Sequence, residues 1–146
     1  MALTPEHDAY LREHQLCVLA TSRRDGSPQL STVIYSYDGT YVTLSVTTDR
    51  AKWANALRQP KVALLVPDGR RQLVAYGTAE PIGPEHPDRI SIWRHHRALQ
   101  GGYPAELWGG TRPLAPPADD AAYAGQLDET KRVLLRIAPT RVLMDH

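Results

Sequence analysis

The stretch PQLSTVIYSYDGTYVTLSVTTDRAKWANAL, residues 28–57, decides the fold of this chain. Two β-rich runs, 28–37 and 41–47, flank the dipeptide Asp38-Gly39. An Asp-Gly pair between two such runs is a strong signal for a tight β-hairpin. The Ala- and Leu-rich residues from about 50 to 59 then predict a helix. The stretch therefore predicts meandering antiparallel strands that lead directly into a helix.

The sequence on either side extends this pattern. Thr48 or Asp49 can cap the helix that follows them, and Thr4-Pro5 predicts the start of another helix that runs to about His14. Further β-rich segments predict strands at 15–22, 61–66, 71–80, 131–138 and 141–144. This order favours a mainly β fold, a small antiparallel barrel with helices covering its ends, over a parallel α/β sheet.

Residues from about 84 to 129 depart from the strand pattern. The range 85–99 predicts a helix interrupted early by Pro87, the Gly- and Pro-rich range 101–117 predicts a loop, and 119–127 predicts a short helix. We expect a single domain over 1–146 with this segment as an excursion from it. Its larger apolar residues could cover a subunit interface: Ile90, Ile92, Trp93, Leu99 and Trp108.

Composition narrows the class of protein. The chain has 146 residues, 42% hydrophobic and 23% charged, which is typical of one globular domain. A net charge of +1 gives no case for nucleic acid or an acidic membrane surface. We find no signal peptide and no membrane-spanning run, so we expect a cytoplasmic protein. We interpret the single cysteine, Cys17, as a core residue. No set of metal-binding side chains has a spacing that indicates a metal site.

Side chains around the start of the predicted helix at 50–59 favour an anion site. Arg50 and Lys52 would lie in its first turn, where the helix dipole disfavours cations unless an anion is bound. Strand alternation puts Ser45 and Thr47 on one face that leads into this turn. Hydroxyls, cations and free N–H groups together favour a phosphate. The alternative is that Asp49 neutralises Arg50 and that these side chains simply face water.

Residues 19–66, LATSRRDGSPQLSTVIYSYDGTYVTLSVTTDRAKWANALRQPKVALLV, resemble the pyridoxamine 5'-phosphate oxidase-like split β-barrel flavoproteins. Within that superfamily they are most similar to the flavin and deazaflavin oxidoreductases that use coenzyme F-420. The resemblance implies a homodimer with two cofactor sites at the subunit interface. It also implies cofactor-binding residues, the first three beside the ring and most of the others beside the phosphate: Gln29, Thr32, Val33, Ser45, Thr47, Arg50, Ala51, Lys52 and Asn55.

One departure from the superfamily bears on the choice of cofactor. The pyridoxamine-phosphate oxidases proper carry an Arg and a Lys on the second strand, where this chain has Ser31 and Ser36. Their loss argues against vitamin B6 oxidase activity and favours coenzyme F-420 over flavin mononucleotide. The 14 Arg against 3 Lys indicate a GC-rich genome, which fits an actinobacterial host of that coenzyme.

The resemblance implies hydride transfer from the C5 atom of a reduced deazaflavin to a small electron-poor substrate. The alternatives are an oxidoreductase that uses flavin mononucleotide and a protein that binds or stores a cofactor without turnover. Four side chains could supply a proton and are not ranked by the sequence: Tyr35, Tyr37, Tyr76 and His95. We expect His95 and His96 on an exposed helix. Arg70 and Arg71 could help to bind the acidic tail of F-420.

Overall fold

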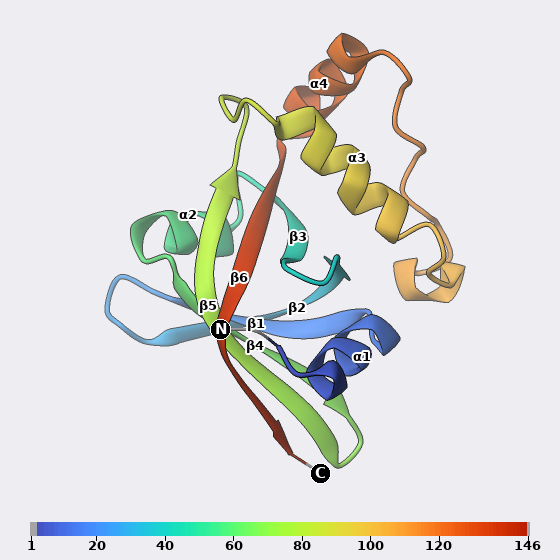
Figure 1. The fold of residues 1–146 in the computed structure, drawn as a ribbon. Helices are drawn as coiled ribbons and strands as arrows, with labels where there is room; N and C mark the ends of the chain where they lie inside the picture. The colour runs from blue at the N-terminus through green and yellow to red at the C-terminus, as the bar shows by residue number, and fades with distance from the viewer. Residues whose placement is uncertain (1–2, 146) are drawn as a thin grey trace.

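The computed structural model describes residues 3–145, which form a closed antiparallel barrel with the strand order β1-β2-β3-β6-β5-β4 (Figure 1). The strands are β1 (Leu16–Ser22), β2 (Pro28–Tyr37), β3 (Val42–Thr47), β4 (Lys61–Asp68), β5 (Arg71–Ile82) and β6 (Arg132–Asp145). The helices are α1 (Pro5–Glu13), α2 (Ala51–Arg58), α3 (Arg89–Leu99) and α4 (Asp120–Glu129), with a short 3-10 turn η1 (Ala105–Trp108). The mainly β barrel predicted from the sequence is confirmed.

The start of α1 and the early hairpins follow the sequence signals. The Thr4 hydroxyl accepts a hydrogen bond from the His7 N–H at 3.1 Å, which caps α1 as predicted. Gly26 and Gly39 have φ values of +86° and +95° in the first two hairpin turns. Residues other than glycine rarely adopt this conformation, so the pairs Asp25-Gly26 and Asp38-Gly39 fix where the chain reverses.

The two closing strands predicted at 131–138 and 141–144 are one continuous strand, β6, which pairs with both β3 and β5. Its register against β5 shifts by one residue, because Tyr76 pairs with Arg141 and Gly77 pairs with Pro139. The extra residue, Thr140, is accommodated by a β-bulge rather than a turn. Its hydroxyl donates to the Tyr76 carbonyl oxygen at 3.2 Å.

The predicted cap of α2 is wrong. Arg50 is the N-cap residue, and no side chain caps the helix. The Asp49 carboxylate instead accepts a hydrogen bond from the Thr47 hydroxyl. Asp49 precedes the N-cap position by one residue, and the first N–H groups of α2 have no side-chain acceptor among the described residues. Lys52 is the second helical residue, and Asn55 and Ala56 are buried against the barrel.

Residues 84–129 pack on the outside of the barrel, where α3 contacts β2 and α4 contacts β6. In Figure 1, α3 and α4 lie together beyond one end of β5 and β6, and η1 follows the far end of α3. A second apolar cluster lies beneath the two helices: Ile82, Trp93, Tyr123, Leu127 and Leu134. Trp93 is fully buried here, and Ile90 and Ile92 pack against the same cluster. The prediction that Trp93 covers a subunit interface is therefore wrong.

Two further sequence expectations concern α3 and the helices as a whole. His95 is exposed as predicted, but His96 is buried, so α3 presents only one of the two imidazoles to solvent. Among the helices of the described chain, none combines the length and the apolar character needed to cross a membrane.

Candidate functional site

A cavity of about 840 Å³ lies between the outer face of the barrel and the segment 84–129. Its barrel wall comes from β1, β2, β3, the start of α2 and the start of β6. Its outer wall comes from α3, the loop that carries η1, and α4.

Four of the predicted cofactor-binding residues line this cavity: Thr32, Val33, Ser45 and Lys52. Thr32 and Val33 come from the middle of β2, Ser45 from β3 and Lys52 from the first turn of α2. The structure therefore brings together residues from both groups implied by the resemblance, those beside a ring and those beside a phosphate.

Gln29 and Asn55 do not line the cavity, and they are bonded to each other. The Asn55 side-chain amide donates to Gln29 Oε1 at 2.9 Å and to Thr21 Oγ1 at 3.2 Å. Asn55 Oδ1 accepts from the Arg58 guanidinium at 3.0 Å. Since Asn55 is buried, these bonds satisfy its amide and hold α2 against β1 and β2.

Thr47, Arg50 and Ala51 also lie outside the residues that line the cavity. The Thr47 hydroxyl donates to Asp49, and this bond holds the pKa of the Asp49 carboxyl below its usual value. Arg50 and Ala51 are exposed. Arg50 is close enough to Lys52, however, for its charge to lower the pKa of the Lys52 ammonium.

Lys52 lines the cavity, and its charge is disfavoured there. Burial lowers its pKa most, and the charges of Arg50 and Arg132 lower it further. Arg132 lines the same cavity, and its guanidinium donates to Ser45 Oγ at 3.2 Å. These cations raise the local potential, so a bound anion would relieve their mutual repulsion.

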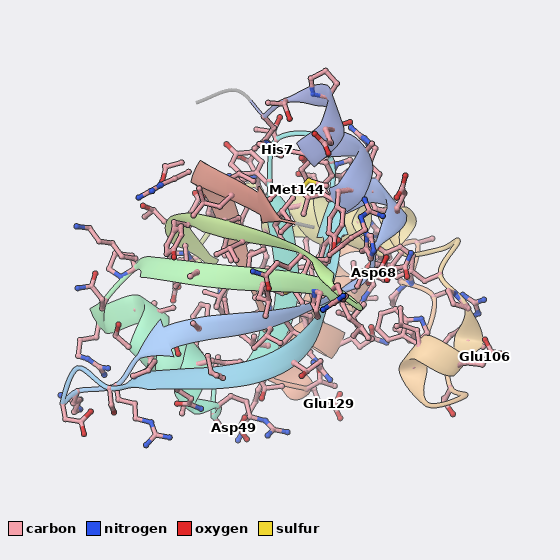
Figure 2. The ribbon with its side chains drawn as sticks, turned by 90° about the horizontal axis from the view of Figure 1, so that it is seen from below. His7, Asp49, Asp68, Glu106, Glu129 and Met144 are labelled. Carbon is pink, nitrogen blue, oxygen red and sulfur yellow. The ribbon has the colours of Figure 1, made fainter. Side chains whose placement is uncertain are left out.

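The charge of the whole cavity has one sign. Its lining includes four cationic side chains, Lys52, Arg97, Arg112 and Arg132, and no Asp or Glu among the described residues. Asp49 and Glu129, which are labelled in Figure 2, are exposed and do not line the cavity. The cavity is therefore suited to an organic anion, with aromatic surface from Trp93, Trp108 and Tyr123.

The sequence did not single out Arg97, Arg112 or Arg132 as site residues. Arg132 could be found only from the pairing of β3 with β6, which places it opposite Thr47 and next to Ser45. Arg97 and Arg112 come from the excursion, which carries no recognised motif. Their placement depends on how α3 and its loop pack on the barrel. No local sequence pattern predicts this packing.

None of the four candidate proton donors lines the large cavity. Tyr35 donates to the Leu11 carbonyl oxygen and Tyr37 to the Asp8 carboxylate, both at 2.8 Å, and burial raises the pKa of each phenol. Tyr76 and His95 lie at two smaller hollows of about 390 and 220 Å³. The described structure thus gives no support to any of the four as the donor in the large cavity.

Other sequence candidates are explained by structure. The Cys17 thiol is buried, and burial raises its pKa to about 12, so it is not a nucleophile. Arg71 lies over the Tyr10 ring at 5.0 Å, and neither it nor Arg70 lines the cavity. Within residues 3–145, no group of three or more metal-binding side chains comes together.

Comparisons with known proteins agree with this fold. The family described as Pyridoxamine 5'-phosphate oxidase matches residues 3–144. A pyridoxine/pyridoxamine 5'-phosphate oxidase of Thermobifida fusca (strain YX) is 31% identical over 121 residues, which are 80% of this chain and 54% of that protein. The chain thus spans about half the length of this curated relative.

Among solved structures, an F420 reductase is 27% identical, with a TM-score of 0.65 over 97% of this chain and 98% of the other. A pyridoxamine 5'-phosphate oxidase-related, FMN-binding protein of Nostoc punctiforme PCC 73102 is 19% identical. It has a TM-score of 0.62 over 97% of this chain and 84% of the other. At that identity, the second likeness supports the fold alone.

Proposed function

The chain belongs to the pyridoxamine 5'-phosphate oxidase family, and from that premise we propose that it is an oxidoreductase that uses coenzyme F-420. In this proposal it acts as a reductase on a small electron-poor organic compound. The observation that carries the proposal is the cavity, whose described lining has four cations, no carboxylate and an aromatic wall. The 27% identity to an F420 reductase over almost the whole chain supports the same choice.

The residues present fit a cofactor phosphate at the Lys52 side of the cavity. Lys52 and Arg132 supply positive charge, and the Ser45 hydroxyl, which accepts from Arg132, can donate its own proton to a phosphate oxygen. The exposed Arg50 adds charge from the turn that precedes α2. We assign the ring to Thr32 and Val33 on β2, which line the same cavity.

The second strand supports F-420 over flavin mononucleotide. Ser36 is buried, and its hydroxyl lies 2.6 Å from His96 Nδ1, so this position contributes neither charge nor an exposed donor to the cavity. Ser31 Oγ is buried with no partner among the described residues. The strand therefore lacks the cation pair of the flavin-phosphate oxidases, and in this proposal Lys52 and Arg132 hold the phosphate.

When bound, a reduced deazaflavin supplies a hydride from its C5 atom. The protein's part is to bind, orient and exclude water. The cations and Ser45 anchor one end of the cofactor. The second apolar cluster, which includes the buried Trp93, fixes the outer wall, and Leu107 and Trp108 give that wall apolar surface beside the cavity. Such a surface disfavours water near the reacting atoms.

The test of this proposal is a titration of purified apoprotein with F-420 and with flavin mononucleotide, followed by fluorescence. We expect F-420 to bind at least tenfold more tightly, a difference of about 1.4 kcal/mol. Tenfold tighter binding of flavin mononucleotide would assign the protein to the flavin branch instead. Reduced F-420 is then supplied with a panel of enones and quinones. Binding without turnover of any of them would favour a cofactor-storage protein.

A further inference from the structure

Arg97 is a half-buried cation that has no carboxylate partner within the part of the chain that the structure describes. Its guanidinium carbon lies 5.2 Å from the Trp93 ring centroid, and its Nη1 donates to Gln100 Oε1 at 2.9 Å. The Tyr123 hydroxyl is its other neighbour, and like Gln100 it is neutral at physiological pH. An arginine has five N–H donors, so this environment leaves part of the guanidinium for an acceptor in the cavity that Arg97 lines.

The other two arginines of α3 are paired. Arg89 contacts Asp128 at 2.7 Å, and Arg94 contacts Asp120 at 2.8 Å. Both acidic partners lie on α4, so two ion pairs join the two helices. Arg97, one turn beyond Arg94, has no such partner among the described residues. Burial lowers the pKa of its guanidinium most, and the charge of Arg132 lowers it further. An unpaired buried charge is costly, and a site that recruits an anion offsets that cost.

We propose that Arg97 binds the carboxylate of the compound that the protein reduces, so that the substrates are apolar or aromatic carboxylic acids. That the bound acid is a substrate rests on the proposed function, but the carboxylate site itself does not. The planar guanidinium can meet a carboxylate with two parallel hydrogen bonds. Leu107, Trp108 and Leu114 line the same outer wall and give a hydrophobic body a surface to pack on.

The position of Arg97 separates this site from the phosphate site. Lys52 belongs to α2 on the barrel wall, whereas Arg97 belongs to α3 on the outer wall. Arg132 lies within electrostatic reach of both, because its charge lowers the pKa of each of them. The cavity thus has cations on both of its walls, which suits two anionic groups rather than one.

The first experiment needs neither cofactor nor turnover. Purified apoprotein is titrated with 2-naphthoate and with the neutral 2-naphthalenemethanol, and tryptophan fluorescence is recorded. We expect naphthoate to bind at least tenfold more tightly than the alcohol, and Arg97→Met to remove that preference. Arg97→Lys keeps the charge but loses the paired geometry, so it should retain only part of the preference.

Arg94→Met is the matched control, since Arg94 is on the same helix, packs over the Tyr123 ring at 5.1 Å and is already paired. It should keep the wild-type preference. An equal preference in Arg97→Met and the wild type overturns the proposal. Loss of the preference in Arg94→Met as well as in Arg97→Met would also overturn it, because the effect would then follow from disturbed packing of α3.

The second experiment distinguishes a substrate carboxylate from the acidic tail of the cofactor. F-420 is titrated into the wild type and Arg97→Met, and KM is measured for a cinnamate-type enoic acid and for its methyl ester. We expect unchanged cofactor affinity and a KM for the acid that rises at least tenfold in the variant. Weakened F-420 binding with an unchanged acid-to-ester ratio would assign Arg97 to the tail and overturn the proposal. If neither cofactor binds but naphthoate does, the proposed function fails while the carboxylate site stands.

Discussion

Lys52 is the residue on which the phosphate site can be tested most directly. Its charge is disfavoured in the apoprotein by burial and by Arg50 and Arg132, so removing it relieves repulsion rather than breaking an ion pair. We therefore expect Lys52→Ala to leave the apoprotein as stable as the wild type, or slightly more so. Cofactor affinity should fall about tenfold to a hundredfold, since a charge-assisted hydrogen bond contributes roughly 1.5–3 kcal/mol.

The measurements are thermal unfolding of the apoprotein and the fluorescence titration with F-420, repeated at high salt. The loss of affinity should shrink as salt screens the site. Arg24→Ala, in the exposed first hairpin turn, is the control and should bind like the wild type. If Lys52→Ala binds cofactor normally but unfolds at a lower temperature, Lys52 is a structural residue and the phosphate site lies elsewhere.

His96 makes stability depend on pH. It is 1% exposed, its Nδ1 lies 2.6 Å from Ser36 Oγ, and burial lowers its pKa to about 3, with smaller effects from Arg97 and His95. The unfolded chain binds a proton at His96 below a pH of about 6.5, while the folded protein does not. The stabilisation is therefore complete above pH 6.5 and is lost as pH falls from there toward 3.

We expect the free energy of unfolding to decrease below pH 6.5 by up to about 1.4 kcal/mol per pH unit from this group alone. Urea unfolding of the wild type and His96→Gln at pH 7.5, 5.5 and 4.5 measures the effect. The variant should be less stable at pH 7.5, because it disturbs a buried hydrogen bond, but its stability should fall less steeply with pH. Parallel curves for the two proteins would contradict this assignment.

At the scale of single elements, the bulge between β5 and β6 depends on a glycine. A Cβ at Gly77 would lie 2.4 Å from the Ala138 carbonyl oxygen and 3.0 Å from Ile137 Cγ2. The oxygen belongs to the backbone of the paired strand, so it cannot move away without distorting the barrel. Gly77→Ala should lower the free energy of unfolding by about 1–3 kcal/mol, the usual range for overpacking.

Gly125→Ala is the matched control, because it lies within α4 and nothing is within 4 Å of its Cβ position. Alanine is the better helix former, so this change should stabilise the protein by roughly 0.4–1 kcal/mol. Urea unfolding of the two variants should therefore move in opposite directions. A stable Gly77→Ala protein would mean that β5 and β6 can separate at the bulge without much cost.

The elements themselves show where sequence reasoning succeeds. Asp-Gly turns, alternating strands and the Thr4 cap are local signals, and the structure confirms the hairpins and α1 that they predict. The sequence predicts two separate closing strands, 131–138 and 141–144, and Pro139, which lacks an N–H donor, lies between them. Only the pairing with β5 shows that a bulge lets β6 continue past it.

The part of the candidate site that depends on local sequence could also be predicted. Ser45 and Lys52 are close in sequence and come together through one strand and one turn, and both line the cavity. Asn55 is among the cofactor-binding residues that the resemblance implies, but its amide holds α2 in place by bonding to Thr21 and Gln29 of two strands. Arg97 could not be found, because only the packing of α3 brings it to the cavity.

At the scale of the whole molecule, function depends on whether one chain alone forms the complete cofactor-binding cavity. Several large apolar side chains remain exposed, among them Leu30 at 65% and Leu114 at 80%. Leu16, at 41% exposed, and Leu114 both line the cavity. Exposed apolar residues that gather at a binding cavity are typical of a surface that another chain covers. The resemblance to the split-barrel flavoproteins implies that the covering chain is a second copy of this protein.

We therefore expect sedimentation velocity at micromolar concentration to give about twice the chain mass of 16.2 kDa. Leu114→Glu should shift the protein toward monomer, because a carboxylate cannot be buried in an apolar interface without a partner. Since Leu114 also lines the cavity, the same variant should bind F-420 more weakly. The control is Leu57→Glu, which changes a leucine that is 52% exposed on α2 and does not line the cavity. A wild-type monomer that binds F-420 with full affinity would show that one chain completes the site, and the shared-site arrangement would then be wrong.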